Sequence, residues 1–233
     1  MNSIPLTSYK DILHYEPECN LARLKWDMQR RERRTPTSFA EQKKFQVIDQ
    51  SLFARPEPIW LEIGAGTGAF FAGLAERNPD RLFIALERCK LRGQRLARKA
   101  EKTENFFGYR GNAVPALVHG VPAGRLERIY ILYPCPWPKN SQRRNRWHMH
   151  PVMPYLVRAL APGGFLVLAS DQKFYVDEAR WVCENEYGMK IPIHGRLEPN
   201  EWNGLEEAPQ GRSKFERDFL LRGQPCYELV AQV

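Results

Sequence analysis

The chain has 233 residues, of which 43% are hydrophobic and 12% aromatic, enough to bury the core of one α/β domain. No run approaches the roughly 18 apolar residues of a membrane span, and the first ten residues lack the layout of a secretory signal, so we expect neither a membrane nor a secreted protein. Five scattered cysteines without a C-x-x-C pair indicate reduced thiols in the cytoplasm rather than a disulfide framework or a zinc site. The net charge of +8 favours a polyanionic partner but does not choose among RNA, DNA and anionic lipid.

The N-terminal part of the chain differs in character from the rest. Residues 1–36 are polar, basic and weakly periodic, which predicts a flexible basic arm with a short helix over 21–33. Ser38 and Glu41 have the spacing of a capping box, so a helix is expected from there to about residue 53. Residues 37–233 are expected to form a single domain.

From residue 59 onward, strand-like and helix-like segments alternate. Strands are predicted over 59–63, 82–86, 105–109, 128–132 and 165–170, and helices over 69–77, 90–101, 150–160 and 173–186. This alternation predicts an α/β fold with a mostly parallel sheet and helices on both faces. Residues 215–233 are expected to add one or two strands at the edge of the sheet.

A glycine-rich turn, Gly64-Ala-Gly66-Thr-Gly68, follows the first predicted strand. Glycines there let the backbone turn sharply and let a ligand approach closely. Glu62 stands two residues before this turn, and Glu87 ends the second strand. Because ligands of parallel sheets bind at the carboxyl ends of strands, we expect both carboxylates to face one crevice, Glu62 toward a cationic group and Glu87 toward ribose hydroxyls. A dinucleotide-binding turn has similar spacing, and either glutamate can instead cap a helix or lie on the surface.

Asn112 follows the third predicted strand. Its amide can bond the edge of an adenine, or it can serve as the N-cap of the next helix.

A proline-rich loop, Y-P-C-P-W-P-K, follows the fourth predicted strand at residues 133–139. Three prolines stiffen it, Trp137 offers an aromatic surface, and the basic residues up to Arg146 can neutralise phosphates. This combination suits an exposed base and its backbone, although Trp137 can equally close the core beneath the loop. Basic clusters at 23–34, 88–102 and 139–146 can each be a solvated face, but three together favour a shared polyanion-binding surface.

This loop and two later motifs resemble the bacterial tRNA (guanine-N7)-methyltransferases. Members of that family carry P-D-P-W-x-K with a basic tail, a Thr-Asp pair followed by Tyr, and T-K-F-E near the C-terminus. The corresponding stretches here are residues 134–139, Ser170-Asp171 with Tyr175, and residues 213–216. The resemblance runs from about residue 61 to residue 229. It implies a Rossmann-like class I methyltransferase fold with a seven-stranded, mostly parallel sheet, S-adenosylmethionine as the cofactor, tRNA or another structured RNA as the partner, and no metal.

The resemblance also implies roles for individual residues. The cofactor is expected at Glu62, Gly64, Gly66, Gly68, Glu87, Asn112 and Cys135. The guanine nucleotide is expected at Lys139, Asp171, Ser213, Lys214, Phe215 and Glu216, and RNA contacts at Ser141, Arg143, Arg144 and Arg146. A catalytic role is implied for the Cys135 position and for Asp171 and Glu216.

Two residues depart from the family pattern, because Cys135 and Asn112 stand where members usually have Asp. Guanine N7 carries an exposed lone pair and attacks a sulfonium methyl group without first losing a proton. A direct SN2 transfer therefore needs no general base, and Asp171 and Glu216 remain to stabilise charge on the purine. Three alternatives stay open: methylation of another RNA site or of a small molecule, a covalent role for Cys135, and a non-catalytic RNA-binding paralogue.

Overall fold

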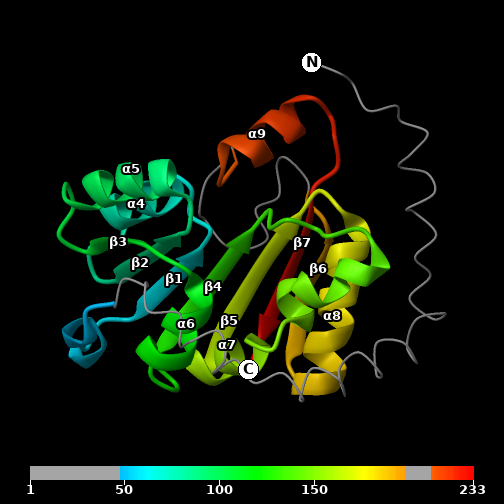
Figure 1. Ribbon diagram of the computed structural model, residues 1–233, viewed down its shortest axis with the longest axis horizontal. Coiled ribbons are helices and arrows are strands. Elements are labelled where there is room, and N and C mark those ends of the chain that lie inside the picture. Colours follow the sequence, from blue (N-terminus) through cyan, green and yellow to red (C-terminus); the bar gives the residue numbers. More distant parts are fainter. Residues whose placement is uncertain (1–47, 198–210) are drawn as a thin grey trace.

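The computed structural model describes residues 48–197 and 211–233, which form a seven-stranded sheet of order β3-β2-β1-β4-β5-β7-β6 (Figure 1). The strands are β1 (Ile59–Ile63), β2 (Leu82–Glu87), β3 (Phe106–Arg110), β4 (Leu126–Leu132), β5 (Leu160–Ser170), β6 (Lys190–Arg196) and β7 (Tyr227–Gln232). β1 to β5 pair in parallel, whereas β7 is antiparallel to both β5 and β6. The predicted seven-stranded, mostly parallel sheet is confirmed.

Helices cover both faces of this sheet, as predicted. Those described are α4 (Ala69–Arg77), α5 (Lys90–Ala100), α6 (Ala113–Pro115), α7 (Met153–Ala159), α8 (Lys173–Tyr187) and α9 (Lys214–Leu221), with short helical turns η2 (Gln50–Ala54), η3 (Ala116–Gly120), η4 (Asn140–Asn145) and η5 (Trp147–Met149). α4 and α5 lie together over β1 to β3, and α6, α7 and α8 lie on the opposite face (Figure 1). None of the helices in the described ranges is long and apolar enough to cross a membrane.

The interior strands β1 and β2 are buried at every position, as expected of parallel strands covered on both sides. Their side chains alternate between the faces. Trp60, Phe83 and Ala85 pack in the cluster under α4 and α5, and Leu61 and Leu86 pack in the cluster on the other side. By this alternation, residues 62 and 87 both point to the side of α4 and α5.

The prediction for residues 215–233 is wrong in two respects. The segment begins as helix α9, because Ser213 accepts from the Glu216 N–H at 3.1 Å and caps the first turn. Its one strand, β7, lies inside the sheet between β5 and β6 and not at the edge. The strand at that edge is β6, which is not among the predicted strands. Pro192 within it lacks a backbone donor, which fits an edge strand whose register shifts between Lys190 and Ile193.

Predictions for the N-terminal part fall largely outside the described residues, including the arm at 1–36 and the start of the helix expected over 38–53. At the described end of that helix, Ile48 and Asp49 are not helical. Asp49 instead caps the separate 3-10 helix η2 by accepting from the Ser51 N–H at 3.0 Å.

Candidate functional site

The glycine turn after β1 leaves an open space at the carboxyl end of that strand. Gly64, Gly66 and Gly68 all have left-handed backbone conformations, with φ of 82°, 60° and 71°, which glycine adopts without strain. A Cβ added at Gly64 or Gly66 would meet no atom within 4 Å. One at Gly68 would lie 2.4 Å from Cδ1 of Leu96 on α5. The first two glycines therefore border space for a ligand, and the third permits close packing of the turn against α5.

Glu87 shapes this turn from the end of β2. Its side chain is only 5% exposed, and it accepts hydrogen bonds from the Gly66 N–H at 2.9 Å and the Cys89 N–H at 2.7 Å. Arg92 of α5 approaches the same carboxylate at 3.4 Å. The carboxylate thus joins the end of β2 to the glycine turn of β1, and the helix-capping alternative describes only part of its role.

Glu62 lies beside Glu87 and is buried without a hydrogen-bond partner for Oε2. It pairs in register with Ala85, two residues before Glu87 on the same side of the sheet. Burial and the negative charge of Glu87 raise the pKa of Glu62 to about 8. A buried carboxylate with an unpartnered oxygen is costly when charged, so this position fits a ligand that brings a positive charge.

Asn112 begins α6. Its Oδ1 accepts from the Val114 N–H at 3.1 Å, so its N-cap role is confirmed. The side chain is half-buried, and its contact with a cofactor stays a prediction.

The proline-rich loop begins directly after β4 and contains two strained residues. Tyr133 and Trp137 have φ of 51° and 47°, a region that residues with a Cβ rarely adopt. Cys135 between them is exposed, and Trp137 is half-buried. Strain of this kind persists only where the surroundings fix it, and it is typical of functional loops.

A buried ionic cluster fixes the start of this loop to α9. The Tyr133 hydroxyl donates to Glu216 at 2.6 Å, and Arg212 donates to the same carboxylate at 2.7 Å and also bonds Glu228. Glu216 is 0% exposed. Although burial raises its pKa, the charge and hydrogen bonds of Arg212 and the Tyr133 hydrogen bond together lower the pKa of this carboxyl below its usual value. The Glu216 carboxylate is thus enclosed by protein groups in this structure, and its contact with the guanine nucleotide stays a prediction.

Other residues of the predicted purine site lie nearer the surface. Phe215 is 41% exposed, and its ring lies 4.8 Å from that of Tyr133 and 4.2 Å from that of Phe219. Asp171 directly follows β5 and is half-buried, and Lys139 and Lys214 are exposed. Ser213 is the N-cap of α9.

The predicted RNA-contacting run divides into inward and outward residues. Ser141 and Arg144 are exposed. Arg143 and Arg146 are 2% and 1% exposed and both pair with Glu178 of α8, so they point inward, and their contact with RNA stays a prediction. The apolar stripe of α8 gave a signal for this cluster, since Glu178 interrupts the spacing of Phe174, Tyr175 and Val182. No comparable signal marks Arg212.

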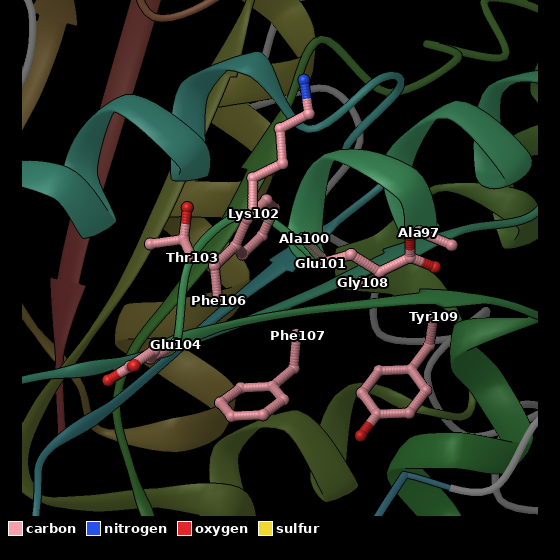
Figure 2. A pocket seen from close by; sticks show the side chains of 10 residues that line it. All are labelled: Ala97, Ala100, Glu101, Lys102, Thr103, Glu104, Phe106, Phe107, Gly108 and Tyr109. Carbon is pink, nitrogen blue, oxygen red and sulfur yellow. The ribbon is translucent and has the colours of Figure 1, made fainter.

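A hollow of about 710 Å³ lies elsewhere, at the β3 edge of the sheet (Figure 2). Phe107 and Tyr109 point to one side of it, and Lys102 points away on the other. Its lining comes from the end of α5 and from β3 and includes neither the glycine turn nor Glu62 or Glu87. The candidate site is therefore the one formed by Glu62, Glu87 and the glycine turn, where Oε2 of Glu62 has no partner and the space over Gly64 and Gly66 is open.

Comparisons with known proteins agree with this geometry. The model of the family Methyltransf_4, described as "Putative methyltransferase", matches residues 56–229. A tRNA (guanine-N(7)-)-methyltransferase of Alkalilimnicola ehrlichii is 32% identical over 183 residues, which cover 76% of this chain and 73% of that protein. One of Leifsonia xyli subsp. xyli is 34% identical over 184 residues, covering 77% and 78%. Among solved structures, the 16S rRNA methyltransferase KamB has a TM-score of 0.56 at 20% identity, covering 82% of this chain and 96% of that one, and this likeness concerns the fold alone.

Proposed function

Since the chain belongs to the tRNA (guanine-N(7)-)-methyltransferase family, we propose that it transfers a methyl group from S-adenosylmethionine to N7 of a guanine in tRNA. One structural observation carries this proposal. Glu62 and Glu87 lie side by side at the carboxyl ends of β1 and β2, next to open space over Gly64 and Gly66. Ligands of open α/β sheets bind in this place.

The residues around that space fit the cofactor. S-adenosylmethionine, when bound, supplies an electrophilic methyl group on a positively charged sulfur. The unpartnered oxygen of Glu62 would accept from the ammonium group of the methionine part. Glu87 still has lone pairs for ribose hydroxyls after bonding two backbone N–H groups, since a carboxylate has about four acceptor positions. Asn112 would face the adenine and Cys135 the sulfonium side.

The purine would enter between the proline-rich loop and α9. Asp171, Lys139 and residues 213–215 are the proposed contacts, with Asp171 balancing the positive charge that the purine gains. Phe215 would offer its exposed ring to a base. Glu216 would act indirectly, by holding the Tyr133 ring through its hydroxyl and not by contact with the purine. No side chain is needed to remove a proton from N7, so the loss of the family Asp at Cys135 leaves the reaction possible.

The RNA backbone would contact exposed cations and polar groups around this opening. Ser141 and Arg144 lie on η4 just beyond the loop. On α5, which begins beside Glu87, Arg95, Arg98 and the nearby Lys102 are also exposed. A tRNA substrate would place the enzyme in the cytoplasm.

Methyl transfer in vitro tests this function. Purified protein is incubated with labelled S-adenosylmethionine and unmodified tRNA, and the methylated base is mapped by nuclease digestion and mass spectrometry. We expect 7-methylguanosine at one position. Methylation of another base, or no transfer together with no cofactor binding by calorimetry, would contradict the proposal.

A second candidate is methylation of another RNA site or of a small molecule. Cys135, exposed in the loop where the family has Asp, favours it. The same mapping experiment separates the two, because this candidate yields a product other than 7-methylguanosine.

A further inference from the structure

Two buried clusters, each with a glutamate at its centre, fix the two strained residues of the proline-rich loop. Tyr133, with φ of 51°, bonds Glu216, as described above. Trp137, with φ of 47°, is reached by a second cluster around Glu178 of α8. The link between that cluster and the loop is Arg146.

Arg146 bonds a row of backbone carbonyls in the loop. Its Nη2 donates to the Trp137 carbonyl at 2.9 Å, and its Nε lies 3.2 Å from the carbonyls of both Pro136 and Trp137. Nη2 also lies 3.4 Å from the Pro138 carbonyl. The Arg146 side chain is 2% exposed, so these bonds are shielded from water.

The other side of the guanidinium is fixed by α8. The Nη1 of Arg146 bonds the Glu178 carboxylate, and the Cζ of Arg146 lies over the Phe174 ring, 4.9 Å from its centroid. Burial alone would raise the pKa of Glu178, but the neighbouring His148, Arg146 and Arg143 lower it to about 2. The carboxylate is therefore charged at any physiological pH and holds Arg146 in one orientation.

We propose that Arg146 is a positioning residue for methyl transfer, which holds the carbonyls of residues 136–138 so that Trp137 and Lys139 keep one orientation toward the substrate. The role in transfer rests on the proposed function, whereas the hold on the loop does not. A planar guanidinium with five donors can bond carbonyls and a carboxylate at the same time; a lysine ammonium cannot reproduce that geometry. Left-handed Trp137 is strained, so loss of these bonds releases the loop to other conformations.

Arg125 provides a matched control. It donates from Nε to the Phe53 carbonyl and from Nη2 to the Glu57 carbonyl, both at 2.9 Å. It therefore fixes backbone carbonyls as Arg146 does, but it precedes β4, whereas the loop follows β4. Arg125→Lys should disturb folding in the same way as Arg146→Lys without touching the loop.

The experiment compares both variants with the full chain labelled with 5-fluorotryptophan. The Trp137 resonance is assigned by its loss in Trp137→Phe. In Arg146→Lys we expect this resonance to shift or broaden and kcat on tRNA to fall at least tenfold, with cofactor affinity within twofold. In Arg125→Lys both the resonance and kcat should stay as in the wild type. If Arg146→Lys does not fold, Phe174→Leu, which keeps Arg146 and Glu178 but removes the ring beneath the guanidinium, takes its place and should likewise shift or broaden the Trp137 resonance.

Two results would overturn the proposal. One is an unchanged Trp137 resonance in the folded Arg146 or Phe174 variant. The other is an unchanged kcat with a higher KM for tRNA and a weaker salt dependence, which is the signature of a lost phosphate contact. If the wild type transfers no methyl group to guanine N7, the proposed function fails, while the resonance still decides whether Arg146 holds the loop.

Discussion

The Tyr133 hydroxyl donates to Glu216 Oε2 at 2.6 Å and so joins the residue after β4 to the first turn of α9, 83 positions further along the chain. Burial and the negative charge of Glu216 raise the pKa of Tyr133, so the hydroxyl remains a donor. Glu216 consequently lies behind the Tyr133 ring. The neighbouring Phe215 ring of α9 is tilted against the Tyr133 ring and remains 41% exposed.

Replacing Tyr133 with Phe tests this bond. The variant keeps the ring contact with Phe215 but leaves the buried Glu216 carboxylate one donor short. We expect the free energy of unfolding, measured in urea, to fall by about 1–3 kcal/mol and kcat to fall several-fold. Tyr155→Phe is the control, since this residue is also half-buried and its hydroxyl has no hydrogen bond among the described residues. Equal effects of the two variants would contradict the role of Tyr133.

Glu62→Gln should change the pH dependence of stability in the cofactor-free protein. The pKa of Glu62 is about 8 in the folded state against an ordinary value of 4.5, so between these pH values the folded state binds more protons than the unfolded state. Wild-type stability therefore falls as pH rises from 4.5 to about 8. At about 1.4 kcal/mol for each pKa unit, the loss is on the order of a few kcal/mol.

The glutamine is neutral and should remove this decline, making the variant more stable than the wild type at pH 9. Chemical denaturation at a series of pH values measures the difference. Calorimetry in buffers of different ionisation enthalpy should in addition show proton release when wild-type protein binds S-adenosylmethionine at pH 7. Parallel stability curves for the two proteins would show that Glu62 does not titrate in this range.

Gly64→Ala and Gly68→Ala should separate ligand space from packing. Both positions have positive φ, so each alanine costs roughly 1–2 kcal/mol of backbone strain. At Gly68 the Cβ would also lie 2.4 Å from Leu96 Cδ1 and 3.0 Å from the Phe106 ring, which adds an overpacking cost of about 1–3 kcal/mol. We expect thermal melting to show the larger loss for Gly68→Ala, and calorimetry the larger loss of cofactor affinity, relative to stability, for Gly64→Ala. The reverse order would mean that Gly64 does not border the cofactor.

Cys135→Asp restores the residue that the family usually has at this position. If the altered site limits turnover, methyl transfer to tRNA should rise several-fold, because a carboxylate beside the purine can balance its growing charge. Cys135→Ala is the companion variant and should retain wild-type activity. Collapse of activity in both variants would instead indicate that the thiol takes part in a different reaction.

Arg144→Glu should weaken tRNA binding, because Arg144 is the arginine of η4 that faces solvent. We expect the KM for tRNA to rise by about tenfold and its dependence on salt concentration to weaken, with little change in melting temperature. Arg180→Glu on α8 makes the same change in net charge at another exposed arginine and should alter KM much less. Equal effects would point to general electrostatics and not to a contact at the loop.

The sequence was sufficient for those parts of the fold that local pattern determines. β1 and α4 begin and end at the predicted residues, since an apolar run, a glycine turn and a helical periodicity follow each other there. Glu62 and Glu87 were placed together correctly because parallel strands end at one edge. β6 was missed because its Pro192 and Gly195 weaken the strand pattern, and α9 because the Ser213 to Glu216 capping box was matched only to a family motif.

The direction in which charged side chains point could not be predicted. Arg143 and Arg146 meet Glu178, 35 and 32 positions away, and a basic run gives no sign of which members turn inward. The same holds for Glu216, whose enclosure depends on Arg212 and on the tyrosine of a distant loop. Burial of charge is decided by tertiary neighbours, and family motifs do not distinguish a contact from the support behind it.

The place of β7 has a consequence for synthesis of the protein on the ribosome. Within the described residues, β6 is joined to the sheet only by β7, although it is made some thirty residues earlier. While residues 227–232 are still to be translated, the unpaired side of β5 and the whole of β6 have no strand to bond, so both can recruit other chains. A nascent or truncated chain lacking this strand should therefore aggregate or engage chaperones, even though β1 to β5 can already assemble.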